Sequence, residues 1–162
     1  MPVVTRNSNL IRPTNAVADF NPGSAQFGVL HTLVGQVSVA LDDFSGSIYT
    51  LGHIPSNARM ARGGFLRWSN LGAGCTGRMR FGATAAAPSG VLNSGVEALT
   101  FSAANVAEPL TNHGDAQLSQ ELWQLCGLAA DPRNMIAATI ELTANAAANG
   151  NIGFYFLFSL PK

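Results

Sequence analysis

The chain has 162 residues, a formal net charge of zero and only 11% charged residues. It is long enough for one domain with a substantial core, and its net charge implies no general affinity for polyanions. Ordinary soluble domains carry roughly 25% charged residues, so this chain has little charge repulsion to keep neighbouring molecules apart. We expect a protein whose surface is partly covered in an assembly; a small monomer rich in alanine and glycine is the alternative.

Residues 1–27 are predicted to form an extended N-terminal arm that precedes one folded domain, residues 28–162. Prolines interrupt the arm, and neither a helical nor a strand-like apolar pattern persists in it. Such a segment buries too little surface to order itself. It would either become ordered on a neighbouring protein or remain a frayed terminus. Its candidate contact residues are Val3, Val4, Leu10 and Ile11.

Short stretches of alternating apolar residues follow the arm, and each predicts a strand with one buried face. These stretches are residues 33–41, 48–54, 60–70, 78–81, 96–103, 136–142 and 152–160. Turn-forming residues separate most of them, and residues 105–115 are predicted to be irregular. About seven short strands at regular spacing predict an all-β fold, which is an antiparallel β-sandwich or a jelly roll.

One short helix is predicted over residues 116–128. Leucines recur there at helical spacing, Asp115 could cap the first turn, and Gly127 could end the last one. The Asp131–Pro132 dipeptide would prevent the helix from continuing into the next strand.

The last two strands are predicted to pair as a C-terminal hairpin, because the segment between them contains the turn dipeptide Asn149–Gly150. The final strand, residues 152–160, is apolar on both faces. Its second face carries Gly153, Tyr155 and Leu157. A strand of this kind is either central in a sandwich or covered by a partner chain.

A group of arginines in the middle of the chain is the candidate charged site. No acidic residue lies between Asp43 and Glu97, whereas acidic residues predominate from Glu97 onward. The two regions could pair between subunits, although solvated charges on strand faces are the more common explanation. The region lacks the interleaved aromatic residues of a nucleic-acid stacking surface, so no nucleic-acid binding is expected. The arginines are Arg59, Arg62, Arg67, Arg78 and Arg80.

Several patterns that resemble catalytic or ligand-binding motifs are better explained as turns and loops. Residues 72–77 match GxGxxG, but a strand follows instead of the helix whose N-terminus would bind phosphate; a tight hairpin connection is expected. Asp42 and Asp43 are adjacent, so their carboxylates would not converge. The scattered histidines, which are His31, His53 and His113, lack the spacing of a metal site. With no GxSxG serine motif, we expect no enzymatic activity, no cofactor and no metal.

The cysteines and tryptophans are expected to be mainly structural. Cys75 and Cys126 lack the spacing of a zinc site or a disulfide framework and are predicted to be buried thiols of a protein made in a reducing cytoplasm. Trp123 is expected in the core, whereas Trp68 fits either the core or an exposed binding site. No signal sequence and no membrane-spanning apolar run is recognised.

Several of these segments together resemble a known protein family. The segments are Leu122–Trp123, Gly127–Leu128 and Asp131–Pro132–Arg133, followed by a strand, a bend rich in alanine and asparagine, and a final apolar strand, with Tyr49–Pro55, Ala58–Arg59 and Gly63–Gly64 earlier. From about residue 33 to residue 160, the chain resembles capsid decoration (cement) proteins of tailed bacteriophages, which have a β-sandwich or jelly-roll fold.

This resemblance implies a non-enzymatic virion protein, made in the host cytoplasm, that binds the outer capsid surface and bridges major capsid protein subunits. We expect a homo-dimer or homo-trimer, with capsid contacts from the arm and, less strongly, from the arginines. The alternatives are another phage head or tail structural protein, or a receptor- or glycan-binding module that uses Trp68 with Arg67 and Asn70.

Overall fold

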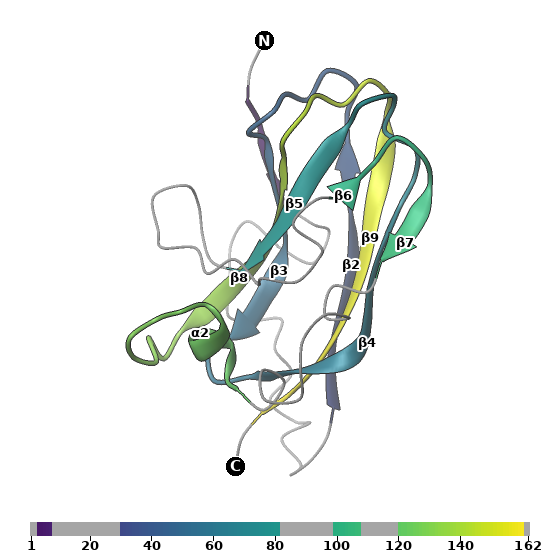
Figure 1. The fold of residues 1–162 in the computed structure, drawn as a ribbon. Helices are drawn as coiled ribbons and strands as arrows, with labels where there is room; N and C mark the ends of the chain where they lie inside the picture. The colour runs from purple at the N-terminus through teal and green to yellow at the C-terminus, as the bar shows by residue number, and fades with distance from the viewer. Residues whose placement is uncertain (1–2, 8–29, 82–98, 108–119, 161–162) are drawn as a thin grey trace.

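The computed structural model describes residues 3–7, 30–81, 99–107 and 120–160. The described strands form two sheets that face each other (Figure 1). Sheet A contains, in spatial order, β1 (Thr5–Asn7), β3 (Ile48–Pro55), β8 (Met135–Leu142), β5 (Thr76–Phe81) and β6 (Leu99–Thr100). Sheet B contains β2 (Leu30–Val39), β9 (Gly150–Ser159), β4 (Arg59–Trp68) and β7 (Asn105–Ala107). The predicted all-β sandwich is confirmed.

The order in which the chain visits the two sheets is that of a jelly roll. Strands β2, β3, β4 and β5 alternate between the sheets, β6 pairs with β5, and β7, β8 and β9 alternate again. Every pairing is antiparallel except that of β1, which lies parallel to β3 at the edge of sheet A. Of the two architectures predicted from the sequence, the strand order matches the jelly roll.

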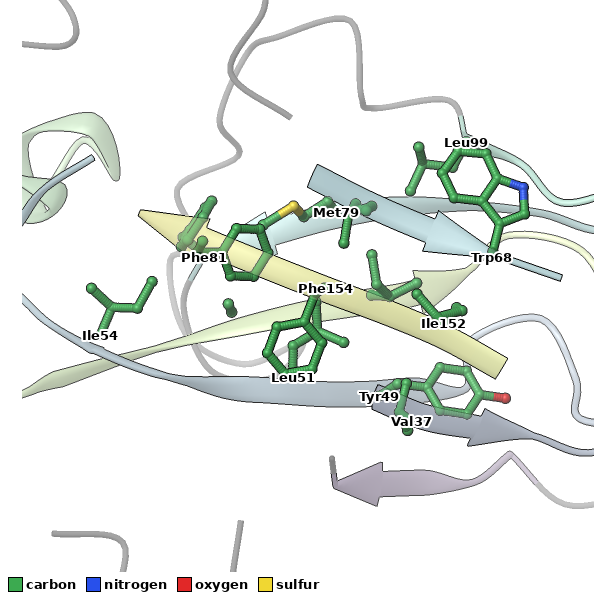
Figure 2. Packing of buried hydrophobic residues seen from close by; sticks show 14 of the residues in the cluster. Val37, Tyr49, Leu51, Ile54, Trp68, Met79, Phe81, Leu99, Ile152 and Phe154 are labelled. Carbon is green, nitrogen blue, oxygen red and sulfur yellow. The ribbon is translucent and has the colours of Figure 1, made fainter. Parts of the chain in front are cut away.

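The core lies between the sheets, and β9 supplies much of it. Its buried side chains are Ile152, Phe154, Phe156 and Phe158. Figure 2 shows side chains of both sheets in this layer, among them Phe154 from β9 and Leu51 from β3. Because β9 pairs with β2 on one edge and β4 on the other, the last strand is central in its sheet, one of the two arrangements predicted from its apolar faces.

The predicted C-terminal hairpin is wrong, because β8 lies in sheet A and β9 lies in sheet B. The residues between them cross from one sheet to the other, and Ala147 and Ala148 donate backbone hydrogen bonds to the carbonyl of Leu71. Gly150 begins β9 instead of completing a tight turn. A Cβ atom at Gly150 would lie 2.5 Å from the Cδ2 atom of Leu71 and closer still to the Ser69 hydroxyl, so a larger residue would displace these two side chains.

The hairpin connection predicted for residues 72–77 is also wrong. These residues lead from β4 in sheet B to β5 in sheet A, so they join strands that do not pair. Gly72 and Gly74 have positive φ angles of 99° and 77°, which glycine adopts readily. Strand β7 is a further difference, since it begins at Asn105 where the sequence predicts irregular structure.

The helix is shorter than predicted. α2 spans only Leu122–Leu125, at one end of the sandwich (Figure 1), while the predicted cap Asp115 and residues 116–119 lie outside the described residues. Glu121 takes the N-cap position, and its backbone N–H donates to the side chain of Gln124. Gly127, at a φ of 68°, ends the helix as predicted. The amides of Gly127 and Leu128 donate to Gln124 and Trp123, the hydrogen-bond pattern of a Schellman motif.

A buried carboxylate connects the turn between β2 and β3 to the rest of the fold. Asp43 is buried, and its Oδ2 atom accepts hydrogen bonds from the Tyr49 hydroxyl at 2.7 Å and the Ala40 amide at 2.9 Å. Its backbone carbonyl accepts from Ala146 in the connection between β8 and β9. Burying a charged group is costly unless it is hydrogen-bonded, so these contacts fix the relative position of the two connections.

We predict that Tyr49→Phe lowers the free energy of unfolding by about 1–3 kcal/mol, because it removes a hydrogen bond to a buried carboxylate while keeping the ring. Urea denaturation followed by circular dichroism measures the change. Tyr155→Phe is the matched control, since Tyr155 lies on the partly exposed side of β9, and a shift within about 0.5 kcal/mol is expected. Equal effects of the two substitutions would contradict the role given to Asp43.

Candidate functional site

The predicted arginine group does not form a single surface. Arg59 and Arg67 are exposed on the outer face of sheet B, where they alternate with the buried Met60, Leu66 and Trp68 along β4. The other pair, Arg78 and Arg80, alternates with buried residues of β5 and projects from the outer face of sheet A. The backbone of Arg62 lies in β4, and its side chain is outside the described part. Arginines close in sequence thus lie on opposite sides of the sandwich.

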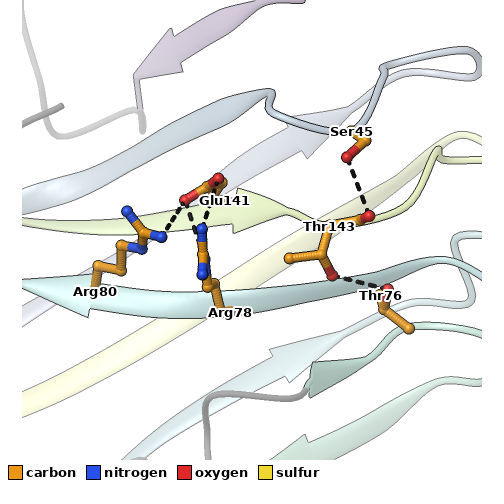
Figure 3. Close-up of polar contacts among 6 residues, drawn as sticks. All are labelled: Ser45, Thr76, Arg78, Arg80, Glu141 and Thr143. Carbon is orange, nitrogen blue, oxygen red and sulfur yellow. Dashed lines mark hydrogen bonds and ion pairs between the residues drawn. The ribbon is translucent and has the colours of Figure 1, made fainter. Parts of the chain in front are cut away.

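The two arginines on sheet A share one carboxylate within the same chain (Figure 3). Arg78 faces Glu141 across the β5–β8 pair and contacts it through Nε at 3.2 Å and Nη2 at 3.1 Å. Arg80 Nη2 lies 3.1 Å from Oε2 of Glu141, the oxygen that Arg78 Nε also contacts. For these residues, the basic and acidic regions of the sequence pair inside one chain, instead of between subunits as the sequence suggested.

The outer face of sheet B carries exposed or half-buried apolar side chains from all four of its strands. Val34, Tyr155 and Phe65 are directly opposite one another on β2, β9 and β4. The Tyr155 and Phe65 rings stack at 5.5 Å, and Val34 and Phe65 remain 55% and 40% exposed. We call the whole set the sheet B strip; it consists of Leu30, Val34, Phe65, Val106, Tyr155 and Leu157. Contiguous apolar patches of this kind are typical of interaction surfaces.

The sequence contained part of the signal for this strip. The sequence shows that the second face of β9 is apolar. Val34 and Phe65 alternate with the buried residues of their strands, which places them on the outer face. Only the register between the strands shows that these residues lie side by side on one surface. That register includes a shift between Ala61 and Phe65 in β4, which no periodicity reveals.

The described part of the N-terminal arm adds to sheet A. The Val4 carbonyl accepts a hydrogen bond from the Ile48 amide at 2.9 Å, and β1 continues alongside β3. Of the predicted contact residues, Val3 is exposed and Val4 is half-buried, whereas Leu10 and Ile11 lie outside the described residues. The arm therefore begins in contact with the sandwich and presents Val3 at its edge.

Trp68 is a core residue. It is 5% exposed, packs edge-on against Phe101 at 5.3 Å, and donates its indole N–H to the Ala103 carbonyl at 3.0 Å. The Asn70 side chain is occupied by a hydrogen bond from the Gly72 amide. Trp68 therefore cannot serve as the exposed aromatic surface on which the glycan-binding alternative depends.

Trp123 packs against the core as predicted, although it is only partly buried. Its indole N–H donates to the Glu121 carboxylate at 2.7 Å. This hydrogen bond connects Trp123, in the first turn of α2, to the N-cap residue Glu121. Trp123 therefore has a structural role.

A pocket of about 800 Å³ lies beside the ends of β3 and β8 and is lined in part by His53, Met135 and Asp131. Hydrogen bonds from the Ser56 hydroxyl and from the Arg133 amide hold the pKa of Asp131 below its usual value. Burial lowers the pKa of His53, which favours the neutral imidazole. The Asp131 carboxylate is thus engaged by the Ser56 hydroxyl and the Arg133 amide, contacts that fix the turn.

The described residues contain neither a cluster of metal ligands nor a membrane-crossing helix. Among them, no group of three or more His, Cys, Asp or Glu side chains is placed to hold a metal ion. No helix in the same part of the chain has the length and apolar character needed to cross a bilayer.

Comparison with known proteins gives structural matches alone. No protein-family model matches the chain, and no curated protein matches its sequence. A chain of the capsid of Ralstonia phage GP4 is similar at 12% identity and a TM-score of 0.48, over 83% of this chain and 86% of that chain. A chain of the cyanophage Pam1 capsid asymmetric unit is similar at 16% identity and a TM-score of 0.48, over 93% of this chain and all of that chain. The function therefore has to be inferred from the surfaces of the molecule itself.

We predict that Glu141→Gln destabilises the protein by about 1–3 kcal/mol, because it leaves two neighbouring arginines without their shared negative charge. The Arg80 side chain is only 16% exposed, so water cannot fully replace the lost carboxylate. Arg78→Gln is the control: Arg78 is more exposed, and the Arg80–Glu141 pair survives, so a cost below about 1 kcal/mol is expected. Chemical denaturation of both variants measures the difference, and a smaller effect for Glu141→Gln than for Arg78→Gln would contradict this account.

We predict that neither thiol reacts in the native protein. Cys75 and Cys126 are buried, and burial raises the pKa of each thiol to about 11. A raised thiol pKa keeps the neutral, unreactive form at about pH 8. Ellman's reagent should therefore detect no thiol in the native protein and both after unfolding in guanidinium. A thiol that reacts rapidly in the native state would show that its surroundings are open.

Proposed function

We propose that this chain is a non-enzymatic structural protein of a tailed-bacteriophage virion. It binds the outer surface of the capsid, where it bridges and stabilises major capsid protein subunits. The observation that carries the proposal is the sheet B strip, an apolar interaction surface built on a rigid jelly roll. The sequence resemblance of residues 33–160 to capsid decoration proteins supports the same role.

The physical properties of the chain fit a protein that holds other subunits together. Its strip lies on paired strands, so its side chains are already in place and little conformational entropy is lost on binding. A chain in which only 11% of the residues are charged repels its neighbours little and suits a molecule surrounded by them. In the decoration role, the chain is made in the host cytoplasm, associates as a dimer or trimer, and uses its N-terminal arm as a second contact.

The glycan-binding alternative loses support because Trp68 is buried and hydrogen-bonded in the core. A role elsewhere in the phage head or in the tail would use the same kind of apolar surface. Whether the chain binds to the capsid surface or to another part of the virion therefore distinguishes the decoration role from this alternative.

We predict that the purified chain binds phage heads prepared without it. The test uses heads of the phage that encodes the chain, made with its gene deleted, and measures co-sedimentation over a range of chain concentrations. Saturable binding to the heads is expected, together with retention of DNA to a higher temperature, because a bridging protein resists separation of capsid subunits. Serum albumin at the same concentrations is the control for protein that sediments with the heads without binding to them.

Two results would contradict the decoration role. Binding to isolated tails but not to heads would support the tail alternative. The absence of binding to any virion component would remove the virion assignment.

A further inference from the structure

We propose that the outer face of sheet B is the face that docks on the capsid, and that the protein surface it meets is apolar with carboxylates beside the apolar centre. This inference rests on the proposed function and deepens it by stating which face binds and what chemistry the partner offers. It is carried by the position of the strip, by the charges beside it and by the contrast with sheet A.

The strip occupies the middle of a sheet instead of a loop or a terminus. Its central residue, Tyr155, belongs to β9, which is hydrogen-bonded to a neighbouring strand on each edge. Val34 and Phe65 flank Tyr155 on the two neighbouring strands, and Leu157 continues the apolar surface along β9. Since the opposite face of β9 is packed in the core, these side chains form a fixed surface that a partner can cover without rearrangement.

Two arginines that make no ion pair within the described part of the chain lie beside the strip. Arg67 is directly opposite Gly153 on β9 and Val106 on β7, and Arg59 is opposite Ser159 at the other end of β4. Both are exposed, and no ion pair or hydrogen bond to either side chain is found among the described residues. The four strands of sheet B contain no aspartate or glutamate.

This charge pattern disfavours a second copy of the same face. If two such faces met, each would bring arginines and no carboxylate in these strands, and like charges would be buried without compensation. Of the described carboxylates, those of Asp43, Glu121, Asp131 and Glu141 are engaged inside the chain. Asp42 is exposed in the connection after β2, outside the four strands of sheet B. A different protein that presents carboxylates around an apolar centre is therefore the complementary partner.

Strands β3, β5 and β8 of sheet A lack both properties on their outer face. Arg78 and Arg80 on this face are paired with Glu141. The exposed large apolar residues of the described chain include none from β3, β5 or β8. The described side chains of the two faces thus differ, and those of sheet B combine exposed apolar surface with arginines that are not paired within the described chain.

The experiment compares variants of the full chain in the head-binding assay. Val34→Glu combined with Phe65→Glu places carboxylates in the strip, and Arg59→Glu combined with Arg67→Glu reverses the charges beside it. We expect each pair to weaken binding at least about tenfold. The wild-type affinity is expected to fall between about 50 mM and about 500 mM salt, and this dependence should shrink in the arginine variant.

Matched controls separate these effects from a general effect of added negative charge. Leu41→Glu alters another exposed apolar residue, 50% exposed, in the connection after β2. Arg133→Glu reverses an exposed arginine in the turn before β8. Both controls should bind like the wild type. Thermal unfolding verifies that every variant is folded, and the arginine variant keeps the test valid if the strip variant fails to fold, since Arg59 and Arg67 make no contact that folding requires.

The outcomes distinguish this inference from the proposed function. If the wild type binds heads and both sheet B variants bind equally well, the docking face is elsewhere and the decoration role stands. If the wild type does not bind, both proposals fall. If native mass spectrometry shows an oligomer that Val34→Glu with Phe65→Glu dissociates, while head binding is unchanged, a second copy covers the strip and the inference is overturned.

Discussion

The fold and the candidate site both depend on strand β9, which is apolar on two faces and paired along two edges. Its inner face supplies Phe154, Phe156 and Phe158 to the core, and its outer face supplies Tyr155 and Leu157 to the sheet B strip. A strand with such a composition would be insoluble in isolation, and pairing on both edges removes its unsatisfied backbone groups. Burial of the inner face then fixes the side chains of the outer face, so the same strand that organises the core also positions the surface available to a partner.

The jelly-roll topology makes each sheet depend on the other. Because most consecutive strands lie in opposite sheets, neither sheet can complete its pairing before the chain has crossed the core several times. The crossing connections meet at one end of the sandwich, where Asp43 pairs with Tyr49 and the backbone of Leu71 accepts from Ala147. Close contact between these connections explains why Gly72 and Gly150 have no room for a side chain. Long-range contacts of this kind imply slow folding relative to helical proteins of the same length.

The sequence predicted most of the longer strands and which of their faces is buried, but it missed β1 and β7 and did not show which strands are neighbours. Alternation along residues 136–142 and 152–160 correctly identified two strands, and the Asn149–Gly150 dipeptide then suggested a hairpin. Alternation reports burial on one face, and two strands that face each other across a core have the same pattern as two strands that pair. The arginines show the same limit, because Arg67 and Arg78 are close in sequence and lie on opposite faces. The strip became visible only when the register placed Val34 and Phe65 beside Tyr155.

The distribution of charge connects the composition of the chain to its surfaces. A chain with few charged residues can satisfy its carboxylates internally, and the described ones largely do so: Glu141 neutralises arginines on sheet A, and Asp43 is buried with its hydrogen bonds made. Among the described strands of sheet B, the charged side chains that remain unpaired are those of arginines, and they lie beside the apolar strip. In water alone, an exposed apolar strip is unfavourable and isolated arginines contribute almost nothing to stability. A complementary protein surface makes both favourable, because it removes the strip from water and gives the guanidinium groups carboxylates to bind in a less polar environment.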